Sequence, residues 1–306
     1  MTPGTRPTTR PLVPVAQRGP AGAPLLWNEE ELRRIITQVE RFGLQPVQAD
    51  LPLSGNIVLG RTGRDADLAI VKANIALAGK LGLQTLTYNF TALRASEGYG
   101  ARLGAGRGGA DLRDFDNTRI ADLPPLPTVG EQPLAAMWER IADFLWAVIP
   151  VAEAAEVRLA VHPNDPPVPI YRGVAQPLAD LAGLQQLVNL VDSSANCIFF
   201  DTGVTTEMGE DVVAVIRSFG ERKRIGAVHF RNVCVTTPSY QYLETFQDEG
   251  DCNMAAAMRA LHEVGYVGLL EPDHTPGIDG DTADTRIGWA FAIGQMIALR
   301  QAAQLR

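Results

Sequence analysis

Apolar residues follow two different spacings along the chain, and the two spacings alternate. Leu32, Ile35 and Val39 recur at steps of 3 and 4, which is the spacing of one face of a helix, and Asn28 before them is typical of an N-cap. Segments of this kind predict helices over 28–42, 65–80, 134–155, 178–191, 211–219, 253–264 and 286–304. Short continuous apolar runs predict strands over 45–51, 83–90, 157–161, 197–200, 225–230 and 267–271.

The regular alternation of strand and helix predicts a parallel sheet with helices packed outside it. At 306 residues the α/β fold that fits best is a (β/α) TIM barrel, and an open doubly wound sheet is the alternative. Six strands are clear, a seventh would lie in 12–16 where Pro14 interrupts it, and no eighth is visible. We therefore expect a barrel whose first β/α unit is incomplete or irregular.

Two segments fall outside this alternation. Residues 1–20 are expected to be a disordered leader, which leaves 21–306 as a single barrel domain. Residues 91–133 form a long, irregular insertion that contains many glycines and the proline-rich run 123–127. A loop of this length is usually functional or disordered. It also follows the carboxyl end of a strand, which is the catalytic side of a barrel.

Composition and charge argue against a nucleic-acid partner and a membrane span. Hydrophobic residues make up 46% of the chain and charged residues 20%, which is typical of a globular protein. A formal net charge of −8 argues against a nucleic-acid partner, which needs clustered Lys and Arg. Without a run of about 18 apolar residues, a membrane span is not expected. Three cysteines without a Cys-x-x-Cys pair favour a cytoplasmic location.

Polar residues gather where the predicted strands end. His162, Asp201 and His229 lie at or just past the ends of three apolar runs, and Asp273 follows a fourth. The carboxyl ends of parallel barrel strands meet at one mouth, so these four side chains are predicted to converge. Two imidazoles and two carboxylates suit Mn²⁺, Fe²⁺, Mg²⁺ or Zn²⁺, and the lack of a thiolate favours Mn²⁺ or Mg²⁺. The alternative is a set of capped strand ends with no ligand.

Three other features are interpreted as non-catalytic. The run 104–109 satisfies Gly-x-Gly-x-x-Gly, but it neither follows a strand directly nor opens a convincing helix, so a dinucleotide site is not predicted. The acidic residues Asp248, Glu249 and Asp251 are interpreted as a solvated turn before a helix. His262 lies within a predicted helix and is expected at the surface.

Several motifs resemble those of one family. His162 opens His-Pro-Asn-Asp-Pro-Pro, which resembles the His-Pro-Asp-Asp-Pro-Pro signature of the mannonate dehydratase family. The segment from His229 resembles its His-Phe/Leu-Arg-Asn strand, and the Glu-Pro-Asp-His around Asp273 is similar to its Arg-Pro-Asp-His ending. The segments 88–90, 191–196 and 250–254 also fit. The similarity keeps its order over roughly 27–299.

The resemblance implies a xylose-isomerase-like barrel that uses a divalent metal, typically Mn²⁺, to dehydrate D-mannonate to 2-keto-3-deoxy-D-gluconate. His162, His229 and Asp273 match the metal-ligand positions of the family, and Asp201 lies where the family usually has a Cys. An oxygen donor in place of sulfur shifts the preference toward harder metals. Mn²⁺ is therefore the expected cofactor, with Mg²⁺ or Fe²⁺ as alternatives.

The same resemblance indicates catalytic residues. His274 matches a residue of the family that is implicated in acid–base catalysis. Glu244 matches the Glu of a His-Glu-Ser segment, whose His is Leu243 here. The catalytic Tyr that the family has near its C-terminus finds no clear counterpart.

Removal of water from an aldonate also needs groups that hold the oxygens or the carboxylate of the substrate. Tyr88, Asn89, Arg94 and Arg231 are candidates for this role. A purely structural role is an equal alternative for Tyr88 and Asn89. It is the favoured one for Arg231, because the residue after an inward-facing strand position can point out of the barrel.

Two alternatives to a sugar-acid dehydratase share the predicted fold. A metal-dependent sugar isomerase or epimerase would use the same centre to move a proton between carbons or to invert one centre. A non-catalytic barrel would bind a sugar acid without converting it. In each case the partner is a small sugar or sugar acid. We also expect a homo-oligomer, because an incomplete barrel would expose a sheet edge that a second chain could cover.

Overall fold

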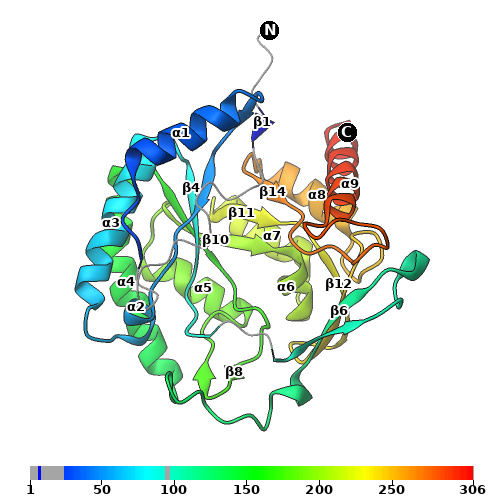
Figure 1. The fold of residues 1–306 in the computed structure, drawn as a ribbon, viewed down its shortest axis with the longest axis horizontal. Coiled ribbons are helices and arrows are strands. Elements are labelled where there is room, and N and C mark those ends of the chain that lie inside the picture. The colour runs from blue at the N-terminus through cyan, green and yellow to red at the C-terminus, as the bar shows by residue number, and fades with distance from the viewer. Residues whose placement is uncertain (1–5, 8–23, 94–96, 306) are drawn as a thin grey trace.

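A six-stranded parallel sheet forms the centre of the computed structural model, which describes residues 6–7, 24–93 and 97–305 (Figure 1). Its strand order is β14-β11-β10-β7-β4-β3, and every neighbouring pair is parallel. The strands are β3 (Gln48–Asp50), β4 (Thr85–Asn89), β7 (Arg158–His162), β10 (Asn196–Asp201), β11 (Ile225–His229) and β14 (Leu270–Glu271). The sheet curves into a half-barrel, so the predicted parallel α/β architecture with six strands is confirmed.

Helices alternate with these strands and cover the outer face of the half-barrel (Figure 1). The predicted ones are α1 (Glu29–Glu40), α3 (Arg64–Lys80), α4 (Leu134–Ala154), α5 (Leu181–Leu190), α7 (Val212–Glu221), α8 (Met254–Glu263) and α9 (Arg286–Gln304). Side-chain caps fix several starts. Asn28 accepts a hydrogen bond from the amide of Glu31, and Asp180 accepts one from Gly183, which places the start of α5 three residues later than predicted.

The predicted strand 45–51 is divided in two. Its first part, β2 (Leu44–Gln45), pairs in parallel with β1 (Arg6–Pro7), and its second part is β3 of the main sheet. Pro46 lies at the break, and a proline has no backbone N–H to give to a sheet. Apart from residues 6–7, the predicted leader 1–20 lies outside the described residues, as does the candidate strand at 12–16.

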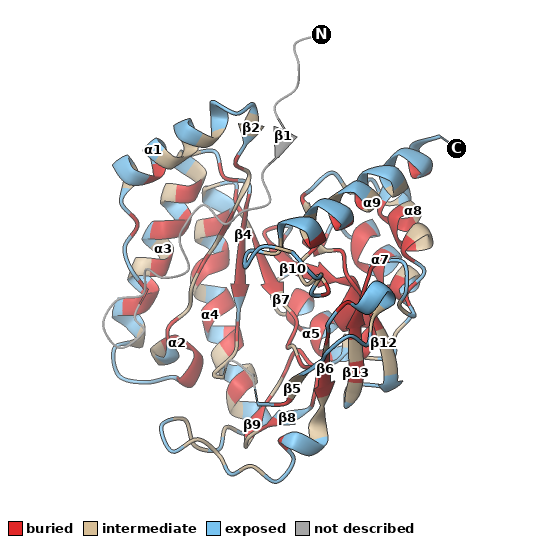
Figure 2. Ribbon diagram, turned by 45° about the vertical axis from the view of Figure 1, so that its right-hand side comes forward, coloured by how far each residue is buried: buried red, intermediate tan, exposed pale blue. Residues whose placement is uncertain are grey.

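The core lies between the sheet and its helices. Figure 2 shows the central strands as buried and the outer faces of α1 and α9 as exposed. The ring of Phe144 on α4 packs against Tyr88 and Phe90, with centroid distances of 5.4 and 5.8 Å. Within the part of the chain that the structure describes, no helix has the length and apolar character needed to cross a membrane.

A second, antiparallel sheet corrects the prediction for the insertion. Residues 91–133 were expected to be irregular, yet they contain the strands β5 (Tyr99–Arg102) and β6 (Leu112–Asp116), which pair as a hairpin. The Gly-rich run 104–109 makes its turn, where Gly104, Gly108 and Gly109 have positive φ. The full strand order is β12-β13-β6-β5, with β12 (Asn232–Thr237) and β13 (Gln241–Thr245).

Short elements complete the chain. They are α2 (Gly55–Leu59), α6 (Thr202–Glu207), the 3₁₀ turns η2 (Arg107–Gly109) and η3 (Asn117–Arg119), and the small antiparallel pair β8 (Ile170–Tyr171) and β9 (Val174–Ala175). The α6 helix follows β10 without a loop, and β12 begins three residues after β11 ends. The half-barrel and the antiparallel sheet therefore meet close to the carboxyl ends of β10 and β11.

Candidate metal centre and active-site cavity

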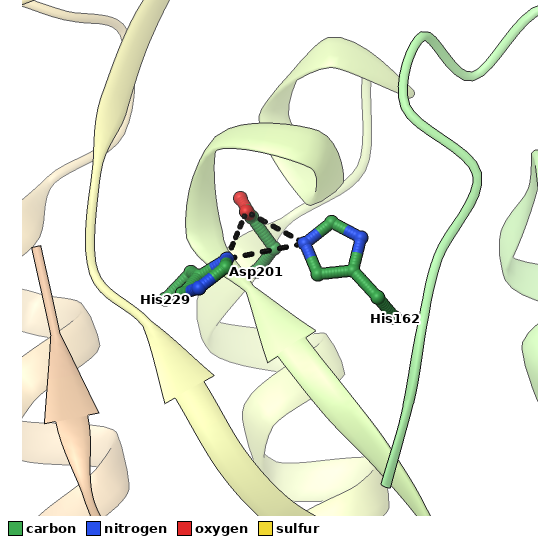
Figure 3. A group of neighbouring side chains, drawn as sticks. All are labelled: His162, Asp201 and His229. Carbon is green, nitrogen blue, oxygen red and sulfur yellow. Dashed lines mark hydrogen bonds and ion pairs between the residues drawn. The ribbon is translucent and has the colours of Figure 1, made fainter. Parts of the chain in front are cut away.

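Three predicted ligands lie at the carboxyl ends of neighbouring strands. His162 ends β7, Asp201 ends β10 and His229 ends β11, and the register pairs Asp201 directly with His229. Figure 3 shows the three side chains pointing toward one another. One donor atom from each lies within 4.8 Å of the others. The parallel register therefore carries residues that are far apart in sequence to one point.

The three donor atoms form a compact triangle. His162 Nε2 lies 3.1 Å from His229 Nδ1 and 3.4 Å from Asp201 Oδ2, and His229 Nδ1 lies 3.2 Å from the same oxygen. The carbonyl oxygen of Pro163 lies 2.8 Å from His162 Nδ1 and can only accept a hydrogen bond, so Nδ1 carries the hydrogen and the lone pair of Nε2 faces the triangle. A metal ligand needs this tautomer.

Asp201 is held on both sides of its carboxylate. Its Oδ1 accepts the amide of Val204 at 2.7 Å as the N-cap of α6, and Oδ2 faces the two imidazoles. Burial favours the neutral acid, but the charges of Arg231 and the imidazoles hold the pKa of Asp201 well below its usual range. This buried group is therefore an ionised oxygen donor.

The charge around His229 favours a cation at the centre. Burial by itself lowers the pKa of the imidazole, but the carboxylates of Asp273 and Asp201 outweigh it and raise that pKa to about 9. Two ring nitrogens only 3.1 Å apart also need a proton or a metal ion between them. The arrangement can thus bind a divalent cation through two imidazoles and a carboxylate.

Asp273, the fourth predicted ligand, lies beside this triangle. Its Oδ2 is 3.6 Å from His229 Nδ1 and 3.2 Å from Arg231 Nε. Its backbone has φ of +57°, a left-handed conformation that is costly for a residue other than glycine. Strained positions of this kind cluster at functional sites, and at this one the carboxylate lies beside the centre.

Arg231 does not contact the cavity. Its side chain is 1% exposed and forms ion pairs of 2.8–3.2 Å with four carboxylates, those of Asp201, Glu207, Asp165 and Asp273. A Cβ at Gly203 would come within 2.6 Å of the guanidinium, so only glycine leaves room for it. This position behind the centre argues against the predicted substrate contact and for the structural alternative.

A cavity of about 430 Å³ opens in front of the centre. Its lining includes His162, His229, Asp273 and His274 together with the predicted substrate residues Tyr88 and Asn89. Asn89 is exposed at the end of β4, next to His162 in register, whereas the ring of Tyr88 packs against α4, as a core residue does. Arg94 lies outside the described residues.

His274 and Glu244, the two predicted catalytic residues, contact each other; His274 lines the cavity, whereas Glu244 is buried and is not part of the lining. His274 Nδ1 is 3.1 Å from Glu244 Oε1, and His274 Nε2 is 3.6 Å from Asp273 Oδ2. Burial lowers the pKa of His274, but the carboxylates of Asp273 and Glu244 raise it above its usual value. Glu244 itself comes from β13 of the antiparallel sheet, so both sheets contribute to this pair.

Several further residues of the site, among them Asp50 in the cavity lining, were not predicted from the sequence. Glu271 lies 3.8 Å from His229 Nε2, and its position at a strand end was an available signal. Asp165 belongs to the His-Pro-Asn-Asp motif and pairs with Arg231. Arg113 lies 3.0 Å from Glu244 and stacks on Tyr99. Both come from the insertion, where the sequence carried no recognisable strand signal.

Comparison with known proteins identifies the family of the chain. The sequence profile described as D-mannonate dehydratase (UxuA) matches residues 128–304. The chain belongs to the D-mannonate dehydratase family. Mannonate dehydratase 2 of Halalkalibacterium halodurans is 28% identical over 283 residues, which cover 84% of this chain and 81% of that protein. Mannonate dehydratase of Streptococcus uberis is 27% identical over 332 residues, or 97% and 94% of the two chains.

Solved structures agree on the fold of this D-mannonate dehydratase family member. Mannonate dehydratase from Streptococcus suis serotype 2 superposes with a TM-score of 0.81 at 25% identity, covering 98% of this chain and 89% of that one. A xylose isomerase domain protein from Planctomyces limnophilus matches with a TM-score of 0.57 at 13% identity, covering 90% and 85%, and indicates the fold alone. The predicted family and the xylose-isomerase-like TIM-barrel fold are both confirmed.

Proposed function

We propose that this protein is a metal-dependent hydro-lyase that removes water from D-mannonate to give 2-keto-3-deoxy-D-gluconate. Membership of the D-mannonate dehydratase family supports a sugar-acid dehydratase. The observation that carries the metal-dependent reaction is the triangle of His162, Asp201 and His229, with His274, which is paired with Glu244, in the lining of the same cavity.

The residues at the centre fit a divalent ion. His162 Nε2, Asp201 Oδ2 and His229 Nδ1 would hold it, with Asp273 as a fourth donor. Nitrogen and oxygen donors without a thiolate favour Mn²⁺, which we propose as the cofactor, ahead of Mg²⁺ or Fe²⁺. When bound, the ion would withdraw electrons from the substrate carboxylate and so make the neighbouring C2 proton more acidic.

The protein itself must move two protons, one away from C2 and one to the departing C3 hydroxyl. His274 is placed for one of these transfers, because Glu244 binds its Nδ1 and leaves Nε2 near Asp273. Asp50 and Glu271 also line the cavity and are carboxylates available for the other transfer. Elimination breaks the C3–O bond, and the enol that forms becomes the 2-keto acid.

An activity assay tests the proposal directly. The protein is loaded with Mn²⁺ and incubated with D-mannonate, and the products are followed by NMR and by a colour reaction for 2-keto-3-deoxy acids. Formation of the 2-keto-3-deoxy acid supports the hydro-lyase. A ketose or an epimer would point to the isomerase or epimerase alternative, and binding without conversion across a panel of aldonates would point to a sugar-acid-binding barrel.

We further propose a single domain over 21–306, a homo-oligomer and a cytoplasmic location. The half-barrel has β3 and β14 at its two ends in the described part of the chain, and an open edge favours association. The three cysteines are free thiols, which suits a reducing compartment. Light scattering of the purified protein tests the oligomer, and a monomer at micromolar concentration would refute it.

A further inference from the structure

The cavity in front of the metal centre is strongly acidic. Four carboxylates line it, those of Asp50, Asp165, Glu271 and Asp273. Against them, Arg113 is the single Lys or Arg in the lining, as far as the described residues go. These acids would repel an anionic ligand, so a negative charge can be held only beside a positive group: the divalent ion, when it is bound, or the guanidinium of Arg113.

Arg113 is held in place before any ligand binds. Its guanidinium carbon lies 3.6 Å from the centroid of the Tyr99 ring, which is a close cation–π stack. Tyr99 is fixed in turn by hydrogen bonds of its hydroxyl with Asp165 and, at 2.8 Å, with Tyr242. A stacked guanidinium loses little conformational freedom when it binds a ligand, which favours recognition.

In the described part of the chain, the side-chain hydrogen bonds of Arg113 all involve one of its three nitrogens, Nη1. Only Nη1 bonds to Glu244, at 3.0 Å, and lies near His274, at 3.2 Å. The side chain of Glu244 is 7% exposed, whereas that of Arg113 is 38% exposed and lines the cavity. Among the residues that the structure describes, Nε and Nη2 form no hydrogen bond to a side chain. They can therefore donate two hydrogen bonds to the carboxylate of a ligand.

We propose that Arg113 binds the carboxylate of the substrate and makes this cavity select a sugar acid over an uncharged sugar of the same size. The inference rests on the proposed function, because it takes the substrate to be a sugar acid. His274 lies between Arg113 and Asp273, at 3.2 and 3.6 Å. A carboxylate on Arg113 would therefore hold the neighbouring carbons beside this histidine.

Binding to an unreactive pair of ligands tests the selection. A hexonate without the C3 hydroxyl cannot lose water, and its amide has the same shape without the charge. Titration calorimetry on the Mn²⁺-loaded full chain should show that the wild type prefers the acid. Arg113→Gln should weaken binding of the acid on the order of 10- to 100-fold and leave the amide unchanged. Arg113→Lys, which keeps the charge but not the fork, should fall between them.

The matched control is Arg102→Gln. Arg102 lies on the same hairpin and pairs with Asp114 at 3.0 Å, but it is not part of the cavity lining. This variant should keep the preference for the acid. Thermal melts show whether each variant folds, and if Arg113→Gln does not fold, the result for Arg113→Lys decides.

Two results would overturn the inference. One is an unchanged preference for the acid in the Arg113 variants. The other is a loss of kcat with unchanged KM and unchanged ligand preference, which would make Arg113 a positioning residue for His274 only. The function itself is tested separately: if the wild type does not convert D-mannonate but Arg113→Gln still abolishes the preference for the acid, the proposed reaction fails and the recognition stands.

Discussion

The half-barrel and the antiparallel sheet supply the same cavity in different ways. The half-barrel contributes short side chains from strand ends, and the parallel register alone brings His162, Asp201 and His229 together. The antiparallel sheet contributes Arg113 of β6, which lines the cavity, and Glu244 of β13, which lies behind it and pairs with Arg113 and His274. The first set suits a metal, which needs fixed donors, and the second suits recognition and proton transfer at the substrate.

The largest effect should come from the half-barrel set. His162→Ala and Asp201→Ala should each lose bound Mn²⁺, and turnover of D-mannonate should fall by about 1000-fold or more, because a bound metal supplies several kcal/mol of catalysis. Metal analysis and a coupled assay on the same samples check this. His262→Ala, at an exposed position of α8, is the control and should behave as wild type. Full metal content in both ligand variants would refute the centre.

A smaller effect, of a different kind, is expected at His274 and Glu244. His274→Gln should keep its metal but lower kcat by about 100- to 10,000-fold, the usual contribution of a general acid or base. Glu244→Gln should lower it less, since Glu244 acts by holding His274 Nδ1 at 3.1 Å. Wild-type turnover in His274→Gln would remove its role. Loss of metal in that variant would instead show that His274 also supports metal binding, so the metal-binding residues and the proton-transfer residues could not be separated.

The same contrast explains what could be predicted from sequence. Strand ends of a parallel sheet converge whatever lies between them, so His162, Asp201 and His229 could be grouped without coordinates. Arg113 could not be found in this way, because its strand lies in a glycine-rich insertion. That strand pairs with β13, and the residues in contact between the two strands are 125 to 131 positions apart in the sequence. For Arg231 the sequence favoured a structural role over a substrate contact, but its pattern could not show the four carboxylates that the guanidinium pairs with.

Arg231 offers a test of the layer behind the metal centre. Arg231→Met keeps most of the volume but leaves Asp201 and Glu207 buried without their cation, so the free energy of unfolding should fall by about 3–5 kcal/mol. Chemical denaturation measures it. Arg217→Met breaks an exposed pair with Glu263 and should cost at most about 1 kcal/mol. Equal losses in the two variants would show that the buried network does not stabilise the fold.

The smallest effect should be a pH dependence in the antiparallel sheet. Hydrogen bonds from Arg119 and Arg102 outweigh burial and hold the pKa of Asp114 below its usual value of about 3.8. A lowered pKa in the folded state means that the ionised group stabilises the fold at neutral pH. This contribution should disappear as the pH falls below about 3.8. Asp114→Asn should therefore be less stable than wild type at pH 7, and the difference should shrink on acidification. A difference in stability that stayed constant down to pH 3 would show that Asp114 acts through packing rather than charge. The strand β6, which carries Arg113, would then be stabilised here by packing and not by ion pairs.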